Sequence, residues 1–243
     1  MKETIYTFAV CRALFAFAEG VRFFAADVAS QDRQSQIIFL GGTTMQKSSF
    51  VVRKMACAAM LTAIAFVLTF YSLPVPGFPP FLKLDISSLP VMIGSFAFGP
   101  LTGVIIAGIK SLLDFIFGSN SAGVGQVADF LITASFALTA GTIYRFNKNR
   151  KGAIIASVAS IFAITIVGAI TNYYILLPFY AKVFMPMDKI LAVCQQINPN
   201  IDSVADYIIY ATVPFNLLKG TIIALLTLVL YKRISVLIHR FAG

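Results

Sequence analysis

The sequence has little charge and few of the side chains on which most enzymes depend. Charged residues make up 12% of its 243 positions, whereas soluble domains carry about a quarter. The only histidine is His239, so the chain has no histidine pair for a metal site or for acid–base catalysis. The P-loop G-x-x-x-x-G-K-[ST] and the motifs H-E-x-x-H and G-x-S-x-G are also absent. We therefore predict that the chain is not an enzyme and that it cannot hydrolyse ATP through a P-loop.

Cysteine is scarce as well. The three cysteines are far apart and form no C-x-x-C pair: Cys11, Cys57 and Cys194. This spacing indicates neither a disulfide framework nor a zinc site. We interpret all three as small apolar side chains.

Apolar residues are abundant. They make up 58% of the chain, and its mean hydropathy is +0.86. One soluble core cannot bury this much apolar surface, so lipid is the expected solvent. The net charge of +9 comes from basic residues between apolar segments, a pattern that membrane topology explains better than a nucleic-acid surface. We predict contact with the lipid bilayer and no nucleic-acid partner.

Six apolar segments approach the roughly 20 residues that a membrane-spanning helix needs. The predicted fold is an all-α integral membrane protein with six transmembrane helices, at about residues 55–73, 86–98, 100–117, 123–145, 152–178 and 207–238. The second segment is short and the third is modest. Because unsatisfied backbone in lipid is costly, we expect both helices to be tilted or partly shielded by their neighbours.

Basic residues indicate the orientation of the predicted helices. They precede the first helix, fill the fourth connection and follow the sixth helix: Lys47, Arg53, Lys54, Arg145, Lys148, Arg150, Lys151, Lys232, Arg233 and Arg240. Cytoplasmic loops carry an excess of Lys and Arg, so both termini are predicted to be cytoplasmic.

The first 44 residues differ from the rest of the chain. They carry scattered charges and no apolar run long enough to span, and their Phe-rich part is too interrupted for a secretory signal. Our hypothesis is that translation begins at Met45, so that residues 1–44 are an extension not translated in the native protein. Residues 45–243 then form the six-helix membrane domain. An amphipathic surface helix over residues 5–25 is the alternative.

The first connection, from Leu73 to Asp85, has four prolines in thirteen residues. This composition predicts a stiff, extended segment that cannot form a helix. A stiff external loop with exposed Phe78 and Phe81 loses little entropy when it closes on a ligand, which favours a lid. A simple spacer between two spans is the alternative.

Three polar side chains fall within predicted spans: Asn172, Asn216 and Lys219. Asn216 and Lys219 are three residues apart and share a helix face. A lysine near a helix centre costs about 2.5–3.5 kcal/mol, so such groups are functional candidates. At a rise of about 1.5 Å per residue, all three side chains can converge in the outer half of the membrane. An interhelical hydrogen bond or a snorkelling lysine is the alternative.

The neighbours of these residues suit a planar ligand. Pro214 cannot donate a backbone hydrogen bond and is expected to loosen the preceding turn. Tyr173, Tyr174 and Phe215 adjoin the polar side chains and could stack on a ring, although aromatic residues at a lipid interface would give the same pattern.

Further polar residues lie on or near the third helix. Lys110 and Asp114 are four residues apart and are predicted to form a structural ion pair. Asn120 and Asp129 flank a Ser/Gly-rich turn and either line the same cavity or are solvated.

The first helix carries Ala59 and Ala63 in a small-x-x-x-small pattern, which Ala56 extends by one turn. Such a face lets another helix approach closely. It indicates a docking surface, with chance spacing as the alternative.

One long ordered run carries a family resemblance. The run PFLKLDISSLPVMIGSFAFGPLTG, from Pro80 to Gly103, is followed by GSNSAGVG at Gly118–Gly125. Together they resemble the riboflavin-specific S-components of energy-coupling factor (ECF) transporters, and the likeness extends from about Met45 to the C-terminus. In that family six helices bind one vitamin from outside a prokaryotic plasma membrane. The resemblance implies a subunit that captures riboflavin and delivers it for ATP-driven uptake, with riboflavin as transported ligand and no cofactor.

The resemblance also implies roles for particular residues. The family's flavin-binding positions match Asn172, Asn216 and Lys219, and its covering loop matches the region of Leu82. With their neighbours, the candidate substrate-binding residues are Asn172, Asn216, Lys219, Leu82, Phe81, Tyr173 and Phe215. The acceptor–donor–acceptor edge of a flavin suits two carboxamides, and Lys219 can donate to a ring oxygen or nitrogen.

The partners follow from the same resemblance. Ala59 and Ala63 occupy the place where the family docks against a membrane-embedded coupling subunit, and two ATPase subunits complete the complex. The missing P-loop agrees with this. The alternatives are an S-component for another vitamin, a small membrane enzyme or a stand-alone carrier.

Overall fold

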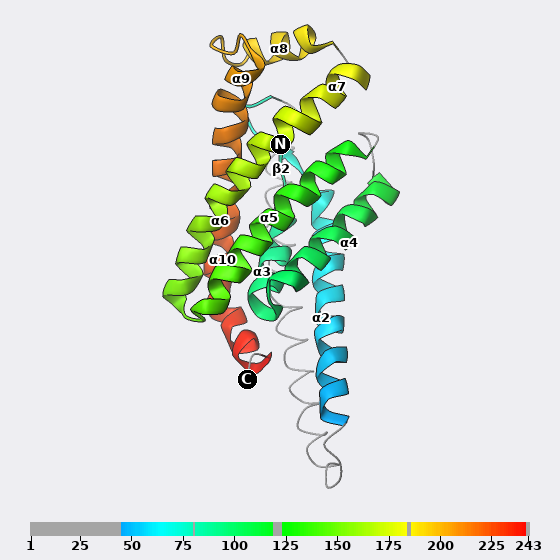
Figure 1. Cartoon of the computed structure of the whole chain (residues 1–243), viewed down its shortest axis with the longest axis vertical. Helices are drawn as coiled ribbons and strands as arrows, with labels where there is room; N and C mark the ends of the chain where they lie inside the picture. The colour runs from blue at the N-terminus through cyan, green and yellow to red at the C-terminus, as the bar shows by residue number, and fades with distance from the viewer. Residues whose placement is uncertain (1–44, 80, 119–122, 184–185, 242–243) are drawn as a thin grey trace, which may run out of the picture. The chain divides into compact units, whose positions relative to one another are not determined.

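The computed structural model describes residues 45–79, 81–118, 123–183 and 186–241, and it is mostly helical (Figure 1). The chain divides into two units, residues 1–57 and 58–243. The predicted extension over residues 1–44, with its alternative surface helix, lies outside the described residues. The site is built entirely within the second unit.

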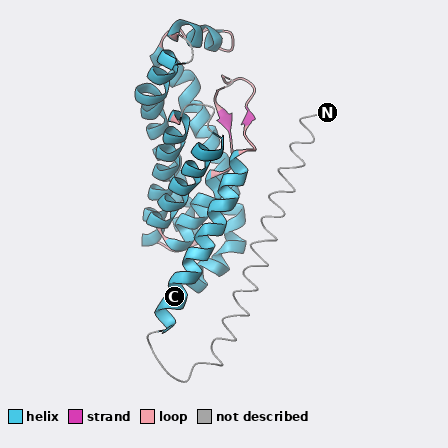
Figure 2. Cartoon of the chain, turned by 90° about the vertical axis from the view of Figure 1, so that its right-hand side faces the viewer, coloured by secondary structure: helices cyan, strands magenta, loops and turns pink. Residues whose placement is uncertain are grey.

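The described residues form a succession of helices and one small hairpin. In chain order the elements are α2 (Met45–Thr69), β1 (Leu73–Pro74), β2 (Lys83–Leu84), α3 (Ser88–Phe98), α4 (Pro100–Gly118), α5 (Val124–Phe146), α6 (Arg150–Thr171), the π-helical turn η1 (Asn172–Leu176), α7 (Leu177–Val183), α8 (Met187–Gln195), α9 (Val204–Tyr207), the π-helical turn η2 (Ile208–Thr212) and α10 (Val213–Phe241). Figure 2 shows the two strands as a hairpin beside the helices.

Within the described ranges, four helical stretches are long and apolar enough to cross a membrane. They cover Pro100–Phe117, Val124–Phe146, Arg150–Val183 and Val204–Leu230. They correspond to the last four predicted spans. The first two predicted spans fall on shorter apolar helices, Lys54–Thr69 and Ser88–Phe98. The number of membrane crossings and the side of each terminus therefore remain predictions.

The short helix α3 lies within the helical bundle. It contacts α4, α5 and α10, and its residues from Ser88 to Phe96 are all buried. Ser95 Oγ donates a 2.6 Å hydrogen bond to the carbonyl oxygen of Ala137 on α5. The expectation that neighbouring helices shield this segment is confirmed, because α3 has little exposed surface.

Local sequence explains where several helices begin. Gly99 adopts a φ of +95°, which side chains rarely allow, and Pro100 then opens α4 with its φ already fixed near the helical value. Asn149 caps α6, since its side chain accepts a 2.7 Å hydrogen bond from the amide of Gly152. Ser203 and Asp206 form a reciprocal capping box at α9.

Two π-helical turns lie just before prolines. The turn η1 ends two residues before Pro178, and η2 ends two residues before Pro214. Proline has no N–H for the usual i to i−4 hydrogen bond, and its ring collides with that carbonyl, so the preceding turn widens. The predicted loosening before Pro214 is confirmed. The two π-helical turns also contact each other.

Candidate functional site

The first connection forms a two-stranded hairpin. Leu73 pairs with Leu84 and Pro74 pairs with Lys83 in antiparallel register. In the tip, the ring of Phe78 meets that of Phe215 edge-on, with centroids 5.5 Å apart. The extended, non-helical conformation predicted for this segment is confirmed.

The hairpin is anchored by an apolar group that we call the hairpin cluster. Its buried members are Leu82, Leu177, Ile190, Cys194, Ile201, Tyr207, Ala211 and Phe215. Phe81 lies at its edge, partly exposed, with its ring centroid 5.9 Å from that of Tyr207. The cluster brings two of the predicted ligand-binding residues, Leu82 and Phe215, together.

Helix α8 supplies two members of this cluster, although no helix was predicted there. Ile190 and Cys194 are four residues apart and therefore face the same side. Pro186 immediately precedes the helix. The sequence signal for this helix was a proline followed by apolar residues at helical spacing. The segment was too short to be interpreted as a membrane span.

Two buried amides lie near the π-helical turns: Asn172 is the first residue of η1, and Asn216 lies on α10 about one turn after η2. Asn172 is 4% exposed and Asn216 is 3% exposed. Asn172 Nδ2 donates to the carbonyl of Gly168 at 2.8 Å, and Asn216 Nδ2 donates to that of Thr212 at 2.9 Å. Each amide bonds one turn back on its own helix, so neither bond ties the two helices together.

Gly168 lies against both amides. A Cβ placed on Gly168 would lie only 2.7 Å from Asn216 Nδ2, so the Asn216 side chain rests against the α6 backbone. Asn172 lies one turn further along the same helix. The convergence of Asn172 and Asn216 on one ligand stays a prediction. Across the described part of the chain, Asn172 Oδ1 has no hydrogen-bond partner although it is buried. A buried acceptor of this kind is suited to a ligand N–H.

Lys219, three residues after Asn216 on α10, is also buried, with 7% of its surface exposed. Its Nζ lies 2.8 Å from Asp85 Oδ2, in the segment after β2. The sequence placed Lys219 within a span but gave no sign of this partner, which is 134 residues away along the chain. The lysine therefore enters the site as one half of an ion pair.

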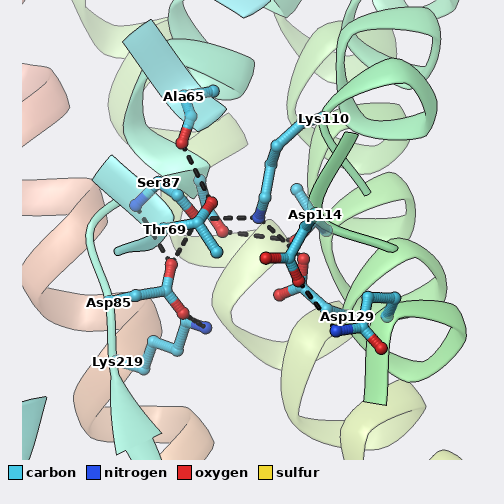
Figure 3. Close-up of polar contacts among 11 residues, drawn as sticks. Ala65, Thr69, Asp85, Ser87, Lys110, Asp114, Asp129 and Lys219 are labelled. Carbon is cyan, nitrogen blue, oxygen red and sulfur yellow. Dashed lines mark hydrogen bonds and ion pairs between the residues drawn. The ribbon is translucent and has the colours of Figure 1, made fainter. Parts of the chain in front are cut away.

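A chain of polar contacts continues from Asp85 across the bundle (Figure 3). Ser87 donates to Asp85 Oδ1 from both its amide, at 3.0 Å, and its hydroxyl group. Ser87 Oγ in turn accepts from Lys110 Nζ at 2.7 Å, and Lys110 Nζ also lies 2.7 Å from Asp129 Oδ2. We call Lys219, Asp85, Ser87, Lys110 and Asp129 the buried ion chain.

The predicted pair of Lys110 with Asp114 is wrong. Lys110 is fully buried and pairs with Asp129 of α5, while Asp114 accepts a 3.0 Å hydrogen bond from Gln126 Nε2. Spacing of four residues favours a pair along one helix face, but Lys110 points into the bundle, where Ser87, just before α3, and Asp129 on α5 are its partners. Asn120 lies outside the described residues.

The charges of the buried ion chain balance, with two lysines and two carboxylates in contact. Asp85 lies in the connection, outside the candidate spans. Its burial acts to raise its pKa, but the charges of Lys219 and Lys110 and the hydrogen bonds from Lys219 and Ser87 outweigh burial and hold the pKa below its usual range. Asp85 is therefore an anion at neutral pH.

The remaining predicted residues are more exposed. Tyr173 is 46% exposed, and its ring packs edge-on against Tyr174 rather than lying buried with its neighbour Asn172. Ala59 and Ala63 are both exposed on α2. Among the described residues, no three His, Cys, Asp or Glu side chains are grouped so that they could hold a metal ion.

Comparison with known proteins shows clear relatives. The "Riboflavin transporter RibU" of Staphylococcus aureus (strain TCH60) is 37% identical over 188 residues, which cover 77% of this chain and 93% of the relative. The "Riboflavin transporter FmnP" of Bacillus subtilis (strain 168) is 30% identical over 186 residues, covering 76% and 93%.

A solved structure and a family model agree with these relatives. The structure, described as the S component of a bacterial ECF transporter, has a TM-score of 0.59 and 36% sequence identity, and it covers 75% of this chain and 95% of its own. The model of the family "ECF transporter, substrate-specific component" matches residues 53–231. This stretch includes the hairpin and overlaps every helix described above. The chain belongs to the family of substrate-specific components of ECF transporters.

Proposed function

We propose that the chain is the riboflavin-binding subunit of an ECF transporter, which captures the vitamin outside the cell and is not an enzyme. The observation that carries this proposal is that two buried amides, Asn172 and Asn216, both lie against Gly168, and that within the described part of the chain Asn172 Oδ1 has no hydrogen-bond partner. The names of the two relatives, both riboflavin transporters, support the choice of ligand.

The chemistry of the ligand matches these groups. The pyrimidine edge of a flavin presents an acceptor, an N–H donor and a second acceptor. Asn172 Oδ1 can accept from the ring N–H, while the Asn216 amide and the Lys219 ammonium can donate to ring oxygen or nitrogen atoms. Riboflavin is then the transported ligand, and the protein needs no cofactor.

The hairpin is the proposed lid of this site. Leu82 and Phe215 supply apolar walls from the hairpin cluster, while Phe81 and Tyr173 lie at more exposed edges. The prolines and the strand pairing stiffen the hairpin. Closing it over a flavin therefore restricts few additional bond rotations and costs little entropy. Release would require the hairpin to leave Phe215.

The proposed topology follows the distribution of basic residues. Six helices cross the plasma membrane, both termini are cytoplasmic, and the hairpin lies outside. The two shorter helices contribute the first and second crossings. The burial of α3 among α4, α5 and α10 supports this for the second one, since a shielded helix does not need the full length of a lipid-facing span.

Energy for uptake comes from other subunits in this proposal. The exposed Ala59 and Ala63 of α2 form the face that docks on a membrane-embedded coupling subunit, and two ATPase subunits hydrolyse ATP. Small residues on an exposed helix face permit close helix approach, which supports this assignment.

The proposal is tested by titrating the purified chain in detergent with riboflavin, thiamine and biotin. The expected result is one-to-one quenching of riboflavin fluorescence that an excess of either other vitamin does not reverse. Folding is checked by thermal unfolding of the same sample. A folded protein that binds thiamine or biotin instead would keep the family and move the ligand to another vitamin. Concentrative uptake by the chain alone in liposomes would identify a stand-alone carrier.

A further inference from the structure

The lysine of the proposed site is held by a carboxylate from the hairpin connection. Lys219 Nζ and Asp85 Oδ2 are 2.8 Å apart, and the two side chains are only 8% and 13% exposed. Asp85 directly follows strand β2, whose last residue is Leu84. Asp85, the first residue after strand β2, is therefore also the residue that holds the lysine.

We propose that Asp85 is a positioning residue for flavin recognition, whose carboxylate fixes the Lys219 ammonium and links its place to that of the hairpin. This inference rests on the proposed function. It adds a residue that does not itself need to touch the ligand.

A lysine at this position needs a partner to have a defined place. Its ammonium sits at the end of a flexible four-carbon stem and has three donor hydrogens. The bond to Asp85 uses one donor and leaves two for a ligand. Without the carboxylate, a buried ammonium would be unpaired, which is strongly unfavourable, so the side chain would turn toward another acceptor or toward water.

Asp85 can set the position of Lys219 because Asp85 is itself held firmly. Its other oxygen, Oδ1, accepts from the amide and the hydroxyl group of Ser87. Ser87 is held in turn by the fully buried Lys110, which is paired with Asp129. The buried ion chain thus connects α10 with the hairpin connection, α4 and α5 (Figure 3). Rigid supporting contacts of this kind are what a precisely placed binding group requires.

The competing explanation is that Asp85 supports the site only through its bonds to Ser87 and not through Lys219. The test compares Asp85→Asn with the matched change Asp114→Asn, since Asp114 is a nearby carboxylate whose hydrogen bond is to Gln126. Both changes keep side-chain size and remove one negative charge. We expect Asp85→Asn to raise the Kd for riboflavin by at least about tenfold and Asp114→Asn by less than about twofold.

A double-mutant cycle tests whether Asp85 acts through Lys219 or independently of it. If Asp85 acts through Lys219, then Asp85→Asn changes the Kd by less than about twofold once Lys219 is already methionine. Equal losses in the Lys219 and Lys219→Met backgrounds would show that Asp85 acts independently of the lysine and would overturn the proposal. An unchanged Kd for Asp85→Asn alone would also overturn it.

A replacement variant and a wild-type control complete the test. If Asp85→Asn does not fold, Asp85→Glu takes its place in the same cycle, because it keeps the charge and moves it by one methylene. Its Kd should rise several-fold, about 3–10-fold, in the Lys219 background and stay constant in the Lys219→Met background. Wild-type protein is titrated in parallel: a folded wild type that does not bind riboflavin refutes the proposed function itself, whereas binding with additive losses refutes only the role of Asp85.

Discussion

Replacing Gly168 with alanine tests whether the Asn216 amide must rest against α6 to bind a flavin. The added Cβ would lie 2.7 Å from Asn216 Nδ2, 2.9 Å from Cγ and 3.0 Å from Oδ1. Ordinary van der Waals contacts begin near 3.4 Å, so the amide must move by several tenths of an ångström or more. That movement strains or breaks its 2.9 Å bond to Thr212.

The expected effect is on binding far more than on folding. Alanine is better than glycine in a helix by up to about 1 kcal/mol, which offsets part of the local strain. A displaced amide loses a ligand hydrogen bond worth about 0.5–3 kcal/mol, so the Kd for riboflavin should rise roughly 3-fold to 150-fold. Thermal unfolding in the same detergent should change little.

Gly108→Ala is the matched control for this prediction. Gly108 lies in α4, and a Cβ there would be 3.5 Å from the nearest atom, in the ring of Phe130, which is an ordinary contact. This variant should bind riboflavin as the wild type does. Fluorescence quenching gives the Kd of all three proteins. Equal Kd values for Gly168→Ala and Gly108→Ala would refute the placement of Asn216 in the ligand site.

Three further predictions concern other parts of the molecule. Asn216→Leu and Lys219→Ala should each weaken riboflavin binding by about 1–3 kcal/mol in the same titration, because each leaves a buried ligand atom unpaired. Unchanged affinity would contradict the assignment of these residues to the ligand site. Burial raises the pKa of Cys194 to about 11, so in a variant with this cysteine alone, maleimide at pH 8 should react slowly until the protein is unfolded. Fast labelling of folded protein would show that Cys194 is not buried in the hairpin cluster. The double change Ala59→Leu and Ala63→Leu should leave riboflavin binding intact but stop uptake in liposomes that contain the coupling and ATPase subunits. Larger side chains on this exposed face block close helix approach. Full uptake would exclude this face as the docking surface.

The sequence predicted those features that depend on local rules. Helical rise and the polarity of the spans placed Asn172, Asn216 and Lys219 in one region, and the structure buries all three. The missing N–H of Pro214 predicted a loosened turn, which is the π-helical turn η2. The shortness of the second segment predicted shielding, which α3 shows. Each of these predictions uses only the geometry of a single helix.

Features that depend on which side chains meet across the bundle were not predictable in the same way. The partner of Lys110 was taken from spacing along α4, but the buried side chain pairs with Asp129 on α5. The pair of Lys219 with Asp85 joins residues far apart in sequence, and a charge in a loop has many equivalent partners until the fold is known. Tyr173 adjoins Asn172 in sequence yet points to a more exposed face.

The most direct test of the account is an experimental structure of this chain with riboflavin bound. The account predicts the pyrimidine edge of the flavin within hydrogen-bonding distance of Asn172 Oδ1 and of the Asn216 amide, with Lys219 Nζ touching both the ring and Asp85. Riboflavin bound elsewhere, with Asn172 Oδ1 still lacking a partner, would contradict it.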